Sequence, residues 1–319
     1  THKGRREQAI IRKRKEYLDA IHNYYDISQV DREGEIMRQI QVDLPRTSPD
    51  TPFFQQPPIQ KSMERILYIW ATRHPASGYV QGMNDLLTPI LIVSLFPYVS
   101  NTNNTNSNNN SKSTTSNSSN TTCSGSSSLV NGVIGYEPSI ATIQDVLRCD
   151  VGALDPSIVM HMECDAYWCL TRLLDNIQDH YTDAQPGLQR MQMKLEDLMR
   201  RIDSELHTHF EAEGLLYIQF SFRWMNCLLL RELPLRAILR VWDTYLSEER
   251  SGFENFHVYV CAVLLKTFRD TLIELPFQDM ILLLQDLPTK EWSEEDIEPI
   301  LSQAFILHSL FEGSPSHLN

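Results

Sequence analysis

One stretch sets the structural class of this chain: Ile59-Gln60-Lys61-Ser62-Met63-Glu64-Arg65-Ile66-Leu67-Tyr68-Ile69-Trp70-Ala71-Thr72-Arg73-His74, followed by Pro75. Its large apolar residues form a stripe at roughly helical spacing, namely Ile59, Met63, Ile66, Leu67, Ile69 and Trp70. Such a stripe predicts an amphipathic helix whose apolar face is buried. Because proline cannot continue the backbone hydrogen bonds of a helix, we expect this helix to stop at Pro75.

Helical patterns continue on both sides of this stretch. They are expected over about residues 5–26, 31–42, 86–99, 188–206, 215–230, 235–246, 256–272, 277–287 and 297–311, with 188–206 as one long amphipathic helix. Asp155-Pro156 is typical of a helix start, with Asp as the N-terminal cap and Pro at the first helical position. The two-residue alternation that marks strands is nearly absent, so the predicted fold class is all-α.

The charge of the chain excludes one class of partner. The formal net charge over 319 residues is −13, whereas nucleic-acid binding depends on clustered Lys and Arg, so we expect no nucleic-acid partner. The first sixteen residues are the exception, because seven basic and two acidic side chains give them a net charge of +5. This segment is interpreted as a solvated helix face, with a contact to lipid or to a partner as the alternative.

A polar insertion interrupts the helical patterns. From Ser100 to about Gly132 the sequence is almost entirely Asn, Ser and Thr, a composition that buries too little apolar surface to offset the entropy of ordering. We therefore predict a disordered insertion in a surface loop at about 100–132. Since helical patterns resume beyond it, the insertion is expected to interrupt a connection without ending a domain.

Cysteine spacing and hydropathy indicate the cellular compartment. The six cysteines include no CxxC pair and have no His nearby at zinc-ligand spacing, which indicates reduced thiols. No apolar run reaches the roughly 18 residues that a bilayer crossing needs, so we expect neither secretion nor a membrane span. The chain begins without Met, and we expect it to be a domain excised from a longer protein.

Two polar stretches flank the helix at 59–74, and neither has the composition of a core. The first is Ile40-Gln41-Val42-Asp43-Leu44-Pro45-Arg46-Thr47, in which a proline stiffens the backbone beside Arg46. The second is Gly78-Tyr79-Val80-Gln81-Gly82-Met83-Asn84-Asp85, in which Gln81 lies between glycines that permit unusual φ values and close approach. Stimulated GTP hydrolysis uses a rigidly held Arg to neutralise charge on the phosphoryl group and a rigidly held Gln to orient the attacking water.

The chain lacks the familiar sequence motifs for binding a nucleotide or for hydrolysis. The patterns GxxxxGK[ST], GxGxxG, HExxH and GxSxG are all absent, so any GTPase chemistry has to act on a nucleotide that a partner holds. The alternative interpretation is an ordinary surface arginine, with Asp43 and Arg46 forming an exposed pair worth under about 1 kcal/mol. The residues alone leave both interpretations open.

The two stretches together resemble the paired finger motifs of the TBC-domain Rab GTPase-activating proteins. The matching pattern is Ile40-x-x-Asp43-x-x-Arg46 followed by Tyr79-x-Gln81-Gly82. A third signature, Phe222-x-Trp224 with Val241-Trp242-Asp243, occurs in the family's order, and the likeness extends from about residue 30 to 311. The segment from Gln55 to Asp85 is most similar to the subgroup that includes the Golgi-acting yeast Ypt GAP.

This resemblance implies a mechanism in trans. Arg46 would enter the nucleotide site of a Rab as an arginine finger, and Gln81 would orient the water in place of the Rab's own glutamine. The implied supporting residues are Asp43, which would hold the rotamer of Arg46, Thr47, Tyr79 and Gly82 in the two loops, and Asn84 and Asp85. The last two would fix the glutamine loop or touch the Rab, and capping of a helix that starts near Leu86 is the alternative. Trp224, Trp242 and Asp243 are expected to serve packing and local hydrogen bonding.

The resemblance also implies the partner and the location. The partner is a GTP-bound Rab that brings its own GTP and Mg²⁺, so the chain is expected to hold no cofactor or metal and to be a GTPase activator with no nucleotide site of its own. The expected location is cytoplasmic and peripheral to endomembranes, the Golgi among them, with a role in vesicle trafficking. The alternative function is a non-catalytic helical scaffold that binds a Rab or an adaptor through the same groove.

The implied architecture is two packed helical subdomains with a groove for a Rab between them. A basic helical lead-in is expected over residues 1–30. The N-terminal subdomain over residues 31–180 carries both finger motifs and the insertion, and the C-terminal helical subdomain covers residues 181–319.

Overall fold

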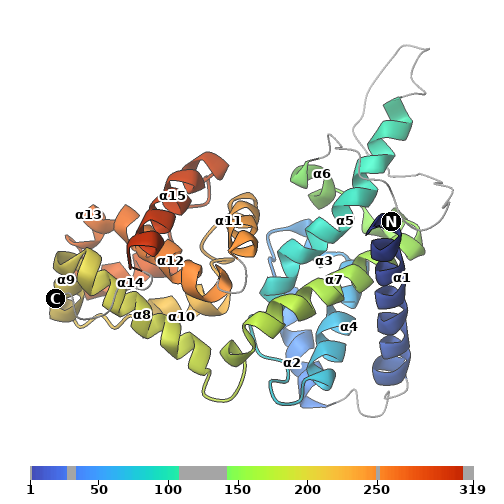
Figure 1. The fold of residues 1–319 in the computed structure, drawn as a ribbon, viewed down its shortest axis with the longest axis horizontal. Coiled ribbons are helices and arrows are strands. Elements are labelled where there is room, and N and C mark those ends of the chain that lie inside the picture. The colour runs from blue at the N-terminus through green and yellow to red at the C-terminus, as the bar shows by residue number, and fades with distance from the viewer. Residues whose placement is uncertain (1, 27–33, 108–141, 249–251, 312–319) are drawn as a thin grey trace. The chain divides into compact units, whose positions relative to one another are not determined.

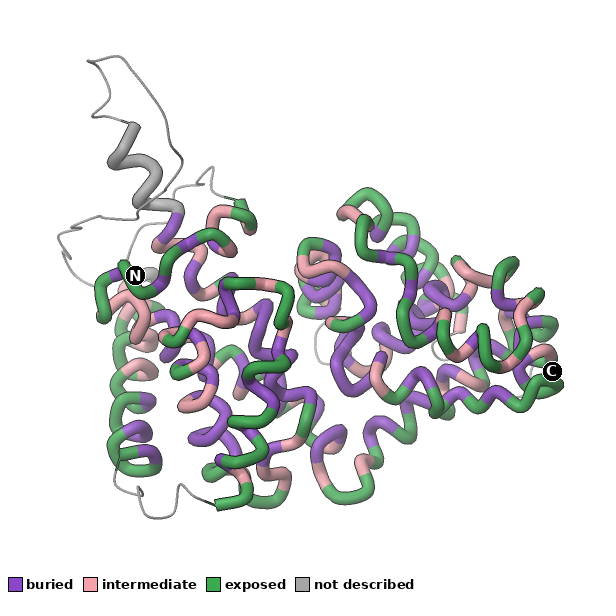
Figure 2. The backbone as a smooth tube through the Cα atoms, turned by 180° about the vertical axis from the view of Figure 1, so that it is seen from behind, coloured by how far each residue is buried: buried purple, intermediate pink, exposed green. Residues whose placement is uncertain are grey.

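The structure is a computed structural model that describes residues 2–26, 34–107, 142–248 and 252–311 (Figure 1). Side chains are described for residues 4–26, 34–99, 142–248 and 252–311. The chain divides into two compact units, unit 1 from Thr1 to Leu173 and unit 2 from Leu174 to Asn319. In each unit the buried residues gather on the inner sides of the helices (Figure 2).

The all-α prediction is confirmed, since every regular element in the described residues is helical. The helices of unit 1 are α1 (His2–Ala20), α2 (Glu35–Asp43), α3 (Pro52–Gln55), α4 (Pro57–Arg73), α5 (Met83–Ser107), α6 (Ile143–Leu147) and α7 (Pro156–Asn176), the last of which runs into unit 2. Short elements in this part are η1 (Ile21–Asp26), η2 (Leu44–Arg46) and η3 (Val151–Ala153).

Unit 2 continues the helical series. Its helices are α8 (Pro186–Ile202), α9 (Ser204–Glu213), α10 (Ile218–Asn226), α11 (Leu235–Ser247), α12 (His257–Thr267), α13 (Arg269–Leu272), α14 (Phe277–Gln285) and α15 (Glu294–Phe311), with short elements η4 (Gln178–His180) and η5 (Gly252–Phe256). Helix α12 packs against α8 and α15 and is buried from His257 to Leu265. An element apolar on all sides belongs at the centre of a core, and α12 has that place in unit 2.

Helix α4 confirms the pattern at 59–74 and links the two polar stretches. It ends at Arg73, and its whole predicted stripe from Ile59 to Trp70 is buried. Helices α2 and α5 both pack against α4. The first polar stretch lies before α4 and the second lies after it. Helix α4 therefore connects the two stretches and helps to fix their positions in unit 1.

A buried carboxylate ties α1 into unit 1. Glu163 on α7 accepts a hydrogen bond from Tyr17 of α1 at 2.8 Å and pairs in two places with Arg65 of α4, at 2.8 and 2.6 Å. The expected solvated basic face is confirmed for Arg12, which is exposed. It is wrong for Arg14, whose guanidinium pairs with Asp165 of α7 at 2.9 and 2.5 Å.

Several predicted helix boundaries are wrong for local reasons. The expected single helix over 188–206 is two helices, because Asp203 leaves helical geometry and its carboxylate accepts from the Leu206 N–H at 3.1 Å, capping α9. The expected helix over 215–230 covers only α10, since Leu228 and Leu229 have φ of 49° and 63°. The cap at Asp155 is confirmed, with its carboxylate accepting from the Ser157 N–H at 2.8 Å.

The predicted insertion at about 100–132 falls largely outside the described residues. Helix α5, which precedes it, ends at Ser107. None of the described helices is both long and apolar enough to cross a membrane.

Candidate functional site

Arg46 lies at the end of a tight turn that follows α2. The 3₁₀ element η2 contains Pro45 near its start, and its flanks are fixed because Leu44 and Thr47 are both buried. Thr47 donates its N–H to the Leu44 carbonyl at 3.1 Å and its hydroxyl to the Asp43 carbonyl at 3.0 Å. Arg46 itself is exposed. The sequence thus presents the guanidinium from a short, anchored turn.

Gln81 lies on the loop between α4 and α5. Two glycines shape this loop, Gly78 with φ of 61° and Gly82 with φ of 108°. Residues other than Gly rarely adopt such positive φ values. The Gly82 carbonyl accepts from the Leu86 N–H at 3.2 Å, which starts α5. Gln81 is exposed between buried neighbours on both sides, Tyr79 and Met83. The loop therefore holds the carboxamide at the surface.

A network of four buried side chains joins the two loops: Asp43, Thr47, Tyr79 and Asn84. The Tyr79 hydroxyl lies 2.8 Å from Asp43 Oδ2 and 3.2 Å from Asn84 Oδ1. A hydroxyl has one proton, and the shorter distance and the negative charge assign it to Asp43. Asn84 donates through Nδ2 to Thr47 Oγ1 at 2.9 Å and accepts the Gly82 N–H at 3.0 Å. Movement of either loop would therefore break hydrogen bonds to the other.

The structure gives Asp43 a different partner from the one expected. Asp43 was predicted to hold the rotamer of Arg46, but its carboxylate turns inward and accepts from Tyr79. Within the described part of the chain, the Arg46 side chain has neither a hydrogen-bond partner nor an ion pair. Asp43 is buried at the end of α2, and the Tyr79 hydroxyl supplies its carboxylate with a hydrogen bond. The Arg46 guanidinium therefore does not have to leave water to pair with it.

Asn84 and Asp85 occupy the first turn of α5, which begins at Met83. The helix therefore starts earlier than the capping interpretation expected, at Met83 and not near Leu86. Asn84 does fix the glutamine loop, through the Gly82 N–H. Asp85 is buried, and an acidic group in a first turn is favoured by the helix dipole.

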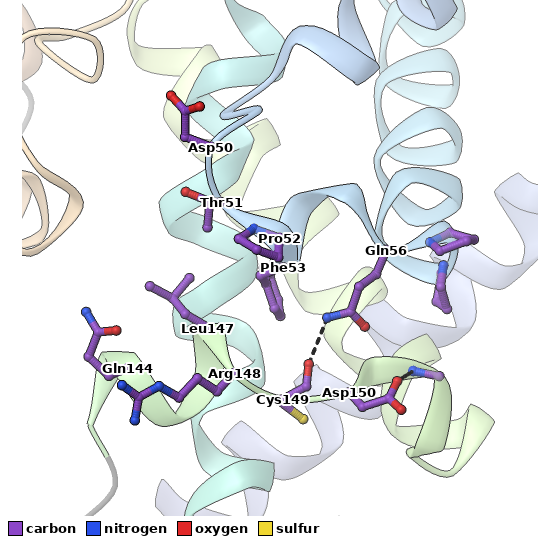
Figure 3. A pocket seen from close by; sticks show the side chains of 13 residues that line it. Asp50, Thr51, Pro52, Phe53, Gln56, Gln144, Leu147, Arg148, Cys149 and Asp150 are labelled. Atoms are coloured by element: carbon purple, nitrogen blue, oxygen red, sulfur yellow. Dashed lines mark hydrogen bonds between the residues drawn. The ribbon is translucent and has the colours of Figure 1, made fainter. Parts of the chain in front are cut away.

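Unit 1 has two surface pockets, one of which adjoins these loops. The larger, of about 820 Å³, is formed by Pro52, Phe53 and neighbours with Leu147 and Arg148, and Gln56 crosses it to donate to the Cys149 carbonyl at 2.8 Å (Figure 3). Neither Arg46 nor Gln81 lines it. The second pocket, of about 780 Å³, is lined by Glu35, Arg38, Gln39 and Val42 of α2, by Asp43, and by Tyr79, Val80 and Gln81. Size alone therefore does not mark the pocket that Gln81 lines.

Sequence reasoning missed the four α2 residues of the second pocket, because an exposed helix face carries no motif. It also missed Gln55, whose side chain donates to the Thr47 carbonyl at 3.1 Å and braces the arginine turn from the other side. A signal for the α2 face existed in the residues. Val42 is an apolar residue within the first polar stretch, and in the structure it is 53% exposed.

The third motif lies in unit 2 and is largely structural. The indole N–H groups of Trp224 and Trp242 donate to the carbonyls of Leu284 and Leu228 at 3.2 and 3.3 Å, and both rings are buried, which confirms their expected packing role. The same expectation is wrong for Asp243, which is exposed and has no such partner among the described residues. No group of three or more metal-ligating side chains is arranged around a common point in the described residues.

Comparison with known proteins adds an independent observation. A family model for the Rab-GTPase-TBC domain matches residues 5–273 of this chain, which include both loops and most of unit 2. The chain belongs to this family. The fold of this TBC domain agrees with that assignment: it matches the crystal structure of the Ypt/Rab-GAP domain of Gyp1p with a TM-score of 0.81 and 40% identity, covering 97% of this chain and 84% of that one.

Full-length relatives of the TBC domain extend beyond it. Human TBC1 domain family member 22B is 43% identical over 314 residues, covering 98% of this chain and 54% of that protein. The GTPase-activating protein gyp1 of Schizosaccharomyces pombe is 41% identical, covering 99% and 54%. The chain thus spans about half the length of the curated relatives it matches. A Chlamydomonas flagellar RabGAP TBC domain, at 17% identity and a TM-score of 0.57, shares the fold alone.

Proposed function

We propose that this TBC domain accelerates GTP hydrolysis by a Rab-family GTPase, to which it supplies two groups in trans. Arg46 neutralises the charge that develops on the transferring phosphoryl group, and Gln81 orients the attacking water. The GTP and its Mg²⁺ belong to the partner. The domain acts where that partner resides, at the cytoplasmic face of an endomembrane such as the Golgi.

The observation that carries this proposal is the network of Asp43, Thr47, Tyr79 and Asn84. Buried hydrogen bonds hold the two loops together, while each loop leaves one long polar side chain at the surface. Such preorganisation suits catalysis, because groups already in place need not reorganise in the transition state. An ordinary surface arginine has no need of an anchored turn joined to a glutamine loop.

The relatives support the same activity. The Schizosaccharomyces pombe protein is named a GTPase-activating protein, and the similar solved structure is described as a Ypt/Rab-GAP domain. The alternative is a non-catalytic scaffold that binds a Rab through the same surface. A scaffold predicts binding without a change in the rate of hydrolysis, so kinetics distinguish the two functions.

Single-turnover GTP hydrolysis on a panel of purified, GTP-loaded Rab GTPases tests the proposal. We expect wild type to stimulate at least one of them, and Arg46→Ala to lower that stimulation by about 10³-fold or more, the contribution of an arginine finger supplied in trans. Gln81→Ala should have an effect of similar size on the same partner. Neither change should alter thermal unfolding noticeably, because both side chains are exposed.

Matched controls are Arg236→Ala and Gln303→Ala, which remove exposed side chains of the same types from α11 and α15. Both controls should retain stimulation within about twofold, as surface changes away from a site normally do. Full stimulation by both Arg46→Ala and Gln81→Ala would reject the mechanism. Binding of a GTP-loaded Rab with no stimulation by wild type would favour the scaffold.

A further inference from the structure

The pocket of about 780 Å³ between α2 and the glutamine loop has a chemistry that the two finger residues do not explain. Its α2 wall carries Arg38 and Val42, which are four residues apart and therefore lie on the same face of the helix. Val42 keeps 53% of its surface exposed. An exposed apolar side chain beside an exposed cation forms a small surface of mixed character.

Arg38 is not used within the domain. In the described part of the chain its guanidinium has no hydrogen-bond or ion-pair partner. Glu35 lies three residues earlier, at a spacing that often allows pairing, yet no ion pair within 4.0 Å joins the two. The Glu35 carboxylate instead accepts from Gln39 at 3.4 Å. The guanidinium of Arg38 therefore remains available at the edge of the pocket.

The pocket is poorly suited to a nucleotide. Glu35 and Asp43 both line it, and the exposed Glu35 carboxylate in particular disfavours a phosphate. A protein surface fits better, since it can cover Val42 and bring a carboxylate to Arg38. Gln81 lines the same pocket, so a protein that presents its nucleotide to Gln81 must also approach this wall.

We propose that this pocket receives a surface loop of the GTPase, with an apolar side chain packed against Val42 and a carboxylate paired with Arg38. The inference rests on the proposed function and adds a role in partner choice to it. Arg38 and Val42 lie outside the buried network that holds Arg46 and Gln81. They therefore determine which GTPase is captured and how tightly, and they leave the chemical step unchanged.

Kinetics with the best substrate of the Rab panel separate capture from chemistry. Arg38→Glu should raise KM by about tenfold or more, because it replaces an attraction with a repulsion at the interface. Val42→Asp should raise KM by about five- to thirtyfold, because the contact loses apolar burial and gains a carboxylate to desolvate. Both variants should keep kcat within about twofold of wild type, since they leave the catalytic groups in place.

Matched controls on α1 are Arg5→Glu and Ile11→Asp, which make the same kinds of change at exposed positions of the same unit. These controls should leave KM within about twofold. A second arm reverses the acidic surface residues of the GTPase to Lys one at a time. One such reversal should restore the KM of Arg38→Glu at least partly, as expected for a direct charge pair.

Three results would overturn the inference. They are an unchanged KM in both pocket variants, a fall in kcat at constant KM, and an equal rise of KM in the α1 controls. In each of these cases Arg46→Ala would still stimulate GTP hydrolysis far less than wild type does. The proposed function would therefore stand. If wild type stimulates no GTPase of the panel, the proposed function fails first and this inference fails with it.

Discussion

Both units contain networks of buried polar groups, but the hydrogen bonds of these networks connect to different parts of the structure. In unit 1 the network of Asp43, Thr47, Tyr79 and Asn84 leads outward, to loops that expose Arg46 and Gln81. In unit 2 some of the buried polar groups lead back into the core instead. His257, for example, contacts the Tyr245 hydroxyl at 2.9 Å and the Trp224 carbonyl at 3.2 Å, all within buried surroundings.

This difference separates two uses of buried polarity. A network that fixes an exposed side chain adds little to stability beyond its own hydrogen bonds, but it sets the geometry of a reaction. A network closed within the core affects chiefly stability, because its groups never reach a partner. Perturbing unit 1 should therefore change rates more than unfolding, and perturbing the core of unit 2 should change unfolding.

The largest effect expected is on the stability of unit 2 in acid. Burial lowers the pKa of His257 to about 3 and that of His180 to about 4. Both values lie below the unfolded pKa of about 6.5, so between pH 6.5 and 4 the unfolded chain binds protons that the folded chain does not. Stability should fall as the pH drops from 7 to 5, by about 2 kcal/mol per histidine. Chemical denaturation at the two pH values measures this loss.

His180→Leu sharpens this test. Both ring nitrogens of His180 are buried without a hydrogen-bond partner among the described residues, so the substitution removes a titrating group and two unsatisfied atoms together. The difference in stability between pH 7 and pH 5 should shrink by about 2 kcal/mol relative to wild type. An unchanged difference would mean that His180 titrates normally in the folded protein.

The sequence predicted the helices of this chain better than it predicted their breaks. The stripe from Ile59 to Trp70 gave α4 because side-chain spacing is a local property. Asp203 was not recognised as a break within 188–206, since a capping aspartate inside an apolar pattern resembles any polar residue on a helix surface. The left-handed conformations of Leu228 and Leu229 depend on tertiary packing, which residue type does not reveal.

The site divides in a similar way. Arg46 and Gln81 were identified from motif spacing and from the glycines and proline beside them, and their catalytic roles stay predictions. The partner of Asp43 was predicted wrongly, because Tyr79 is 36 residues away and only the fold brings its hydroxyl to that carboxylate. The exposed wall formed by Arg38 and Val42 was missed, since a single apolar residue in a polar stretch, Val42, was its one signal in the sequence.

A smaller effect is expected from Tyr79→Phe, which removes one hydroxyl from the unit 1 network. The Asp43 carboxylate would lose its bond at 2.8 Å, at a cost of about 1–3 kcal/mol in unfolding free energy. Stimulated hydrolysis should fall by about 10- to 100-fold, because the loop with Gln81 would lose one of its two side-chain links to the arginine turn and keep only the bond from Asn84 to Thr47. Single-turnover kinetics and denaturation on the same samples measure both effects.

Tyr167→Phe provides the matched control for that change. Its hydroxyl is also in unit 1, where it accepts from Arg73 at 2.8 Å, but it has no part in the network that holds the two loops. We expect a comparable loss of stability and hydrolysis within about twofold of wild type. Equal losses of activity in Tyr79→Phe and Tyr167→Phe would show that unit 1 responds to destabilisation in general.

The smallest effect on stability is expected from substitutions at Gly78. They distinguish the cost of an unfavourable backbone conformation from the cost of a steric clash. Gly78 has φ of 61°, but a Cβ placed on it would have no atom within 4 Å, so Gly78→Ala should cost only the left-handed backbone term of about 1–2 kcal/mol. Gly78→Asn should cost less than Gly78→Ala, because Asn tolerates this conformation better.

In unit 2, at Gly252, a larger residue is excluded by a steric clash. A Cβ on Gly252 would lie 1.9 Å from the Tyr245 carbonyl oxygen, so Gly252→Ala should destabilise more than either change at Gly78, by forcing η5 away from α11. Urea denaturation of the three variants ranks these costs. If Gly78→Asn were as destabilising as Gly252→Ala, packing and not backbone conformation would decide which residues fit in the loop that carries Gln81. The contrast between the exposed loops of unit 1 and the closed core of unit 2 would then not apply to these two glycines.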